Sequence, residues 1–239
     1  MTGRLQRRAL LALLLSVVLP CAAADWQTTS EAWGQRLGQF SAYLDQAFRK
    51  REGGFKGSKD KLAVIVAGKK AGSGFLVRAG NRCWLYTNAH VVDGTPPSDV
   101  RATLLNNMAL SLGACQRAQG LDLVRFALVG PLPAFVRERN MPDIGEAVTV
   151  LGNSDGRGVV TEIRGHIIGV GPQQIEVDAP FVAGNSGSPV LNRAGRVVGV
   201  ASYLRNCRDN ADWSKSNTRY NGIRRFALRL SSVRWMAMP

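Results

Sequence analysis

Hydrophobic and polar positions divide the chain into four stretches with different spacing. An apolar run, interrupted only by Ser16, covers residues 9–19, and residues 26–48 place large apolar side chains at helical spacing. Residues 61–203 carry short apolar runs separated by Gly, Pro and Asn, which is typical of strands and turns. Helical spacing returns in Gly222–Met236, where one face would hold Ile223, Phe226, Ala227 and Leu230. The pattern predicts an all-β body with an amphipathic helix before it and another after it.

Nine runs in the third stretch are expected to form strands. They are short and closely spaced, and no helical period separates them, which favours a sandwich or barrel. The predicted strands are Leu62–Ala67, Gly74–Arg78, Cys83–Thr87, Leu123–Val129, Ala147–Leu151, Ile163–Val170, Gln174–Val177, Pro189–Leu191 and Val197–Ala201.

The first 24 residues have the pattern of a secretory signal peptide. Three arginines precede the apolar run 9–19, which is too short to span a bilayer, and small residues follow it up to Ala24. Cleavage there would begin the mature chain at Asp25, and acylation of Cys21 is the weaker alternative. Residues 25–60 are expected to form a helical arm and loop, packed on the body or used for homo-oligomerisation. The protein is expected to be exported, either periplasmic or secreted.

Charge first suggests nucleic acid or an anionic membrane as a partner, because the formal net charge is +14. The signal segment holds +3 of this, and residues 203–239 hold +6, from eight basic and two acidic residues. No aromatic and basic interleaving accompanies the charge, so a nucleic-acid partner is not expected. The basic C-terminal end either touches an anionic membrane surface or solvates the outer face of a packed helix.

Three cysteines remain after the signal segment: Cys83, Cys115 and Cys207. An oxidising compartment permits one disulfide, and Cys83 with Cys115 is the weakly preferred pair. None of the three has metal-ligand spacing, and the only histidines are His90 and His166, so neither a metal nor another cofactor is expected.

Candidate chemistry lies in three short segments of the β region. A strand end carries His90, an aspartate at position 122 opens an apolar strand, and Ser186 lies on a glycine-flanked turn. A serine hydroxyl becomes nucleophilic when an imidazole takes its proton, and a carboxylate on the other ring nitrogen orients that imidazole. Together these residues predict a catalytic triad of His90, Asp122 and Ser186. The backbone N–H groups of Gly184 and Ser186 are expected to form an oxyanion hole.

These segments resemble those of trypsin-fold serine proteases, specifically the bacterial HtrA (Deg) branch. The motifs are Thr87-Asn88-Ala89-His90-Val91-Val92, Asp122-Leu123 and Gly184-Asn185-Ser186-Gly187, supported by Gly72–Val77, Val150–Asn153 and Ile175–Ala179. The resemblance covers residues 61–203. It implies two six-stranded antiparallel β-barrels within a protease domain at 61–239, with the site between them. It also implies an exported serine endopeptidase acting on proteins or peptides, and by analogy a trimer formed through the N-terminal segment.

The chain departs from the pattern of typical HtrA proteins at Ser188 and in the length that follows Ser186, and it differs from digestive relatives at Asn185. Ser188 stands where a second glycine is usual and crowds the turn behind Ser186. Asn185 replaces the aspartate of digestive relatives, so their ammonium-dependent zymogen switch is expected to be absent. The 53 residues after Ser186 leave no room for a PDZ domain. The alternative function is therefore a catalytically inert scaffold or binding protein of the same fold.

Several assignments keep rivals. Asp93 is a second candidate for the triad acid, although it reads as a turn residue, and His166 is expected to be structural. The substrate-binding residues are expected to be Pro180, Val200, Ala201 and Ser202, by position relative to Ser186. No carboxylate is evident among them. An uncharged, small or medium apolar side chain is therefore expected on the acyl side of the scissile bond, the P1 position.

Overall fold

The computed structural model describes residues 57–58, 60–153, 159–207, 222–231 and 233–238. The predicted signal peptide and almost all of the N-terminal arm lie outside these residues. Short helical turns at Ala89–Val92 (α3) and Pro97–Asp99 (η2) interrupt a fold made otherwise of strands. None of the described helices is long and apolar enough to cross a membrane.

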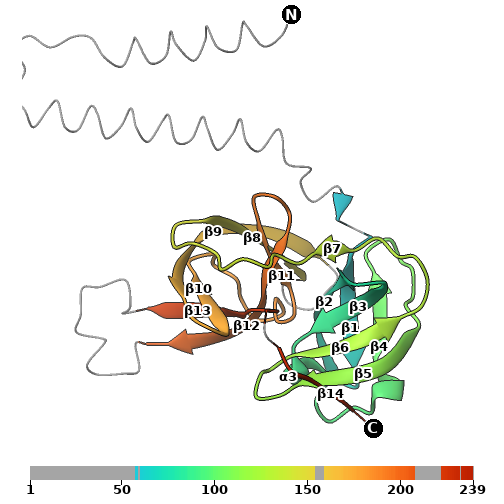
Figure 1. The fold of residues 1–239 in the computed structure, drawn as a ribbon. Coiled ribbons are helices and arrows are strands. Elements are labelled where there is room, and N and C mark those ends of the chain that lie inside the picture. Colours follow the sequence, from blue (N-terminus) through green and yellow to red (C-terminus); the bar gives the residue numbers. More distant parts are fainter. Residues whose placement is uncertain (1–56, 59, 154–158, 208–221, 232, 239) are drawn as a thin grey trace, which may run out of the picture. The chain divides into compact units, whose positions relative to one another are not determined.

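The N-terminal half forms an eight-stranded sheet with the order β14-β5-β6-β3-β2-β1-β4, and β7 pairs with β2 (Figure 1). Most of its ladders are antiparallel. Glycines at the turns allow the tight connections between neighbouring strands: Gly68, for example, has φ +60° between β1 and β2. The strands are β1 (Leu62–Ala67), β2 (Lys70–Ala79), β3 (Arg82–Thr87), β4 (Arg101–Leu104), β5 (Leu112–Ala118), β6 (Val124–Leu128), β7 (Phe135–Val136) and β14 (Trp235–Ala237).

The C-terminal half forms a closed six-stranded barrel with the order β10-β13-β12-β11-β8-β9. In Figure 1 the barrel carries the orange and red strands, apart from β14. Its strands are β8 (Ala147–Asn153), β9 (Val160–Val170), β10 (Gln174–Val177), β11 (Pro189–Asn192), β12 (Val197–Asn206) and β13 (Ile223–Leu228).

The core consists of three apolar clusters, one in each half and one between the halves. One lies within the first sheet around Ile65, Leu85 and Phe126, and another fills the barrel around Ile175 and Phe181. The third joins the halves, because it contains side chains of the first sheet such as Phe75 and Leu123 together with Leu151, Val200 and Leu228 of the barrel. The site described below lies where β2, β3 and β6 meet the barrel.

The all-β architecture is confirmed, and each of the nine predicted strands corresponds to an observed one. The expectation of two closed barrels is confirmed only for the C-terminal half. The first half is a sheet whose path ends at β4 and β14 without a ladder between them.

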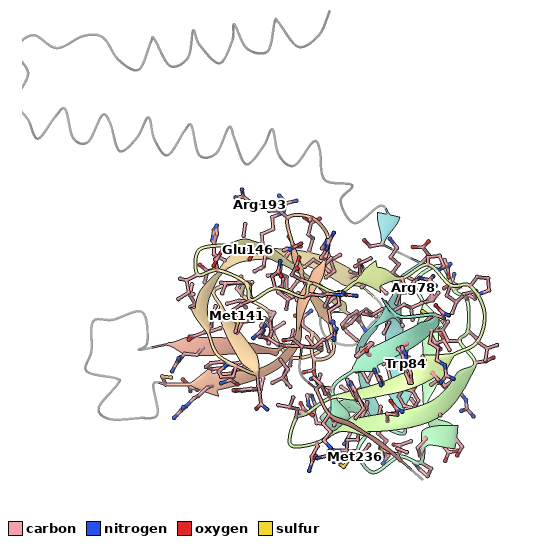
Figure 2. The ribbon with its side chains drawn as sticks, in the orientation of Figure 1. Arg78, Trp84, Met141, Glu146, Arg193 and Met236 are labelled. Carbon is pink, nitrogen blue, oxygen red and sulfur yellow. The ribbon has the colours of Figure 1, made fainter. Side chains whose placement is uncertain are left out.

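The predicted C-terminal helix over Gly222–Met236 is wrong. This segment forms β13 and β14 instead, and Arg229, placed on a solvated face by the helical reading, is only 6% exposed. β13 lies between β10 and β12, so its side chains face the barrel interior on one side and neighbouring structure on the other. Figure 2 shows Met236 with the first sheet, which also carries Trp84. The basic C-terminal end is therefore not the outer face of a helix.

The preferred disulfide between Cys83 and Cys115 is also wrong, because both cysteines are free and buried. Cys83 pairs with Leu128 of β6, and Cys115 pairs with Phe126 on the other side of that strand. With β6 between them, their backbones are about 9.5 Å apart, which is beyond the reach of a disulfide. Burial raises the pKa of the Cys115 thiol to about 11.

Candidate active site

His90 and Asp122 are brought together by the pairing of β3 with β6. Thr87 at the end of β3 lies opposite Val124 at the start of β6. The turn that follows β3 and carries His90 therefore lies next to Asp122, two residues before the start of β6. His90 Nδ1 lies 2.6 Å from Asp122 Oδ2, and the His90 backbone N–H donates to Asp122 Oδ1 at 2.8 Å. These contacts fix the imidazole in position and orientation.

Asp122 has a third partner in Ser202, whose hydroxyl donates to Oδ2 at 3.0 Å. Asn88 Nδ2 donates both to Ser202 Oγ and to the Asp122 backbone oxygen. Burial alone would raise the pKa of Asp122, but the hydrogen bonds from His90 and Ser202 outweigh it and leave the pKa lowered. The carboxylate is therefore ionised over the neutral range.

The rival acid Asp93 is engaged elsewhere. Its carboxylate accepts two hydrogen bonds from the Arg117 guanidinium. His166 lies on β9 and contacts Asp178, its backbone N–H donating to Oδ1 at 2.5 Å. Neither residue belongs to the cluster around His90.

Ser186 is the second residue of the second of two consecutive β-turns, which share Asn185. The Asn185 N–H donates to Val182 O at 3.1 Å, and the Ser188 N–H donates to Asn185 O at 2.9 Å. The third residue of each turn is glycine: Gly184 has φ +89° and Gly187 has φ +86°. Positive φ at that position is required by a type II turn and favours glycine. Ser186 Oγ donates to the backbone oxygen of Ser202 at 3.3 Å, so Ser202 connects the nucleophile turn to Asp122.

The first sheet holds this turn through Ser73 of β2. The Ser73 N–H donates to Ser186 O at 3.0 Å, and the Ser73 hydroxyl donates to Gly184 O at 3.0 Å and accepts from the Asn153 N–H at 2.9 Å. A Cβ at Gly187 would lie 2.0 Å from Ser73 O, so only glycine allows this approach. The shape of the turn thus depends on both halves of the molecule.

The predicted oxyanion donors have no internal acceptor. Among the described residues, none accepts a hydrogen bond from the N–H of Gly184 or of Ser186. Both groups belong to partly exposed residues. Because buried backbone N–H groups are almost always paired, two unpaired donors next to a serine hydroxyl are available to a ligand oxygen.

Two residues singled out in the sequence, Asn185 and Ser188, are buried beside Ser186. Asn185 is completely buried, and its side-chain oxygen accepts the Val182 N–H at 3.0 Å, so a neutral amide stabilises the first turn. Ser188 is also completely buried, and its hydroxyl has no hydrogen-bond partner among the described residues. A Cβ at Gly152 would overlap the Ser188 side chain, so the pair packs tightly behind the turn.

The predicted substrate-binding residues are not equally accessible. Pro180 is exposed, whereas Val200 and Ala201 are completely buried, and Ser202 is 4% exposed. The accessible side chains of β12 near the site belong instead to Tyr203 and Leu204. Sequence reasoning missed Asn88 and Ser73, although each is a polar residue inside a motif that it had singled out. The described residues contain no group of three or more potential metal-ligating side chains.

A fold of a sheet and a barrel, with His90, Asp122 and Ser186 at their junction, is that of a trypsin-like peptidase domain. Residues 72–200, more than half of the chain, match the family model of the trypsin-like peptidase domain, and the chain belongs to this family. Within it, the chain has DegP/HtrA-like relatives. The probable periplasmic serine endoprotease DegP-like of Brucella suis is 32% identical over 145 residues, or 56% of this chain.

Other relatives agree with this placement. The putative serine protease HhoB of Synechocystis sp. is 29% identical over 155 residues. The matches span 27% of the Brucella protein and 34% of the Synechocystis protein, so the chain covers about a third or less of these relatives. A serine endoprotease from Yersinia pestis has the same fold, with a TM-score of 0.56 and 21% identity over 73% of this chain and 60% of its own.

Proposed function

We propose that this protein is a serine endopeptidase that cleaves protein or peptide substrates through an acyl-enzyme on Ser186. The observation that carries the proposal is the pair of hydrogen bonds that lock His90 onto Asp122, together with Ser186 on a partly exposed turn formed with two positive-φ glycines. The names of the relatives as serine endoproteases support the same activity.

In this mechanism His90 acts as the general base. A carboxylate only accepts hydrogen bonds, so the Nδ1 atom facing Asp122 carries the ring hydrogen and Nε2 keeps its lone pair. Ser186 Oγ turns from Ser202 O towards Nε2 by rotation about χ1. As Oγ attacks the substrate carbonyl carbon, Nε2 takes the hydroxyl proton, and the imidazolium then gives it to the leaving amine. A water molecule hydrolyses the acyl-enzyme by the same proton route.

The unpaired N–H groups of Gly184 and Ser186 would stabilise the oxyanion that forms on the carbonyl oxygen. Such donors contribute about 3–4 kcal/mol each to transition-state stabilisation in serine proteases. Tyr203 and Leu204 of β12 pair with β13 on one side, whereas the ladder with β11 on the other side ends at Val200, so this free edge is suited to bind the extended substrate backbone.

Export to the periplasm is part of the proposal. It rests on the pattern of residues 1–24 and on the periplasmic naming of the Brucella relative. The segment Trp26–Phe48 is proposed to mediate homo-oligomerisation. Comparison of the mass of the secreted protein in solution with and without residues 25–52 tests this: a monomer in both forms contradicts the oligomer.

An inert binding protein is the second candidate, and one observation favours it: Ser186 Oγ contacts Ser202 O, with no hydrogen bond to His90 among the described residues. Labelling with a fluorophosphonate decides between the two. A competent nucleophile gives covalent labelling of the parent protein and none of Ser186→Ala. Absence of labelling in a folded parent protein, together with no cleavage of an unfolded substrate such as casein, overturns the endopeptidase.

A further inference from the structure

Arg225 is an arginine on the inner side of the barrel. Side chains alternate along a strand, so Arg225 and Ala227 of β13 point to the same side. Ala227 is completely buried in the cluster that fills the barrel. The register places Val177, a member of the same cluster, directly opposite Arg225 on β10. Arg225 is itself only partly buried, so it lies where this interior opens to solvent.

The position of Arg225 relates it to the nucleophile turn. Its Nε donates to the backbone oxygen of Phe181 at 2.9 Å, five residues before Ser186. Its partner across the β12–β13 ladder is Leu204, two residues after Ser202. Two residues of strand span about 7 Å, and the Ser202 oxygen contacts Ser186 Oγ at 3.3 Å. The arginine is therefore bordered by the segments that precede and flank the serine, within reach of a side chain adjacent to the scissile bond.

The guanidinium has unused donors and no carboxylate partner among the described residues. Besides Phe181 O it donates to Ile223 O at 3.3 Å, which accounts for two of its five N–H groups. Its neighbour Arg224 is different, because it forms a two-point ion pair with Glu176. Burial lowers the pKa of Arg225, so its charged form lacks compensation from the protein. A carboxylate ligand would supply this compensation and fit the planar fork.

We propose that Arg225 binds the side-chain carboxylate of an aspartate or glutamate at P1, which makes the protein selective for acidic residues on the acyl side of the scissile bond. This inference rests on the proposed endopeptidase function. It replaces the expectation of an uncharged P1 residue. That expectation was based on Pro180 and on residues of β12, because β13 was predicted to be a helix with its arginines on the surface. Residues 1–24 hold +3 of the net charge of +14, so the chain that remains after their removal carries +11, and this positive charge also attracts acidic segments.

Arg229 provides a matched control. It directly follows the last residue of β13, donates to the backbone oxygens of Gly171 and Pro172, and like Arg225 has no carboxylate partner among the described residues. It contacts the β9–β10 hairpin and not the segment before Ser186. A purely structural role for these arginines predicts similar effects of Arg225→Gln and Arg229→Gln, whereas P1 recognition predicts a change in selectivity at Arg225 alone.

The test uses the full chain and two peptides that differ only in Glu or Gln at P1, with cleavage positions read by mass spectrometry. We expect kcat/KM to favour Glu roughly 10- to 100-fold, as charged hydrogen bonds do. The ratio should fall to near one in Arg225→Gln, be partly retained in Arg225→Lys, and be unchanged in Arg229→Gln. Equal cleavage or a Gln preference in the parent, or a ratio unaffected by Arg225→Gln, overturns the inference.

A binding measurement separates this inference from the proposed function. The Ser186→Ala variant is titrated with the same uncleaved peptides by fluorescence anisotropy, so that recognition is measured without turnover. If the parent protein neither labels nor cleaves, the endopeptidase fails, while tighter binding of the Glu peptide that disappears in the Ser186→Ala/Arg225→Gln double variant still supports carboxylate recognition by Arg225. Equal binding of the two peptides overturns the pocket, whatever the activity.

Discussion

The first sheet and the second barrel contribute to the site in different ways. The sheet supplies His90 and Asp122, which hold each other by direct hydrogen bonds at two adjacent strand ends. The barrel supplies Ser186 on a turn shaped by two positive-φ glycines and by Ser73, a residue of the sheet. The sheet therefore supplies both His90 and Asp122, although Ser202 of the barrel also donates to Asp122, whereas the turn that carries Ser186 is shaped by residues of both halves. Substitutions at His90 or Asp122 should alter proton transfer, and substitutions around the turn should alter the position of Ser186 and of the oxyanion donors.

The largest effect is expected from removing either reacting group. Ser186→Ala and His90→Ala should each lower kcat on the order of 10⁶-fold, and the double variant should lose little more, because the two act as a unit. Active-site-titrated kinetics on a protein substrate measure this. If the kcat loss of the double variant were the product of the two single losses, His90 and Ser186 would not act on the same proton.

Asp122→Asn tests the contribution of the sheet alone. An amide can donate its own hydrogen to Nδ1 and so favour the wrong imidazole tautomer, and kcat should fall on the order of 10⁴-fold with little change in KM. Asp93→Asn is the matched control, because its carboxylate binds Arg117. A larger loss at Asp93 than at Asp122 would reverse the assignment of the acid.

The same carboxylate predicts a pH dependence of stability. The pKa of Asp122 is lower in the folded protein than in the unfolded chain, so ionised Asp122 stabilises the fold above the unfolded value of about 3.9. This contribution is lost as the pH falls through the folded pKa. The difference in unfolding free energy between the parent and Asp122→Asn should therefore shrink on acidification below about pH 4. A difference that grows would contradict the sign of the shift.

Ser73→Ala tests the link between the halves. Loss of the hydroxyl frees Gly184 O and leaves the Asn153 N–H without its acceptor. We expect kcat to fall roughly 10- to 100-fold through a misplaced oxyanion donor, with a smaller change in KM. Thr87→Val is the control, since it removes the bond to Ser73 O but leaves both bonds of the Ser73 hydroxyl. Equal kcat effects in both variants would indicate general destabilisation.

The smallest effect is expected at Ser188, behind the turn. Its buried hydroxyl has no partner among the described residues, so Ser188→Ala should raise the unfolding free energy by about 1 kcal/mol and preserve activity. Ser202→Ala, which removes a bonded hydroxyl, should do the opposite. Urea denaturation measures both. A destabilised Ser188→Ala would mean that the hydroxyl has an important role in the turn.

The strands were predictable where both faces are apolar. Leu62–Ala67 and Cys83–Thr87 are nearly continuous apolar runs, and the structure buries most of their residues. β5 was not predicted because its sequence, Leu-Gly-Ala-Cys-Gln-Arg-Ala, has few large apolar side chains. Its extended structure depends on pairing with β6 and β14. β13 was mistaken for a helix because Phe226, Ala227 and Leu228 are buried consecutively on two packed faces, and consecutive apolar residues also fit a helical stripe.

The candidate site was also predictable from the sequence only in part. The approach of His90 to Asp122 could be expected from residue types in order, since each lies at the end of a recognisable strand. The roles of Ser73 and Arg225 could not, because they depend on register and on contacts between segments more than 40 residues apart, such as Arg225 with Phe181. Sequence separation of this size leaves no local signal in composition or spacing.

β14 has a consequence for how the protein folds. Residues 235–237 pair with β5, and the Met238 N–H donates to Cys115 O, although β5 and β14 are separated by the whole barrel in sequence. The N-terminal sheet therefore cannot acquire its last strand until the ribosome has made the barrel and the residues that follow it. Contacts that close such long loops slow folding. The sheet is therefore completed only after the barrel has been synthesised, and the edge of β5 that pairs with β14 stays open until then.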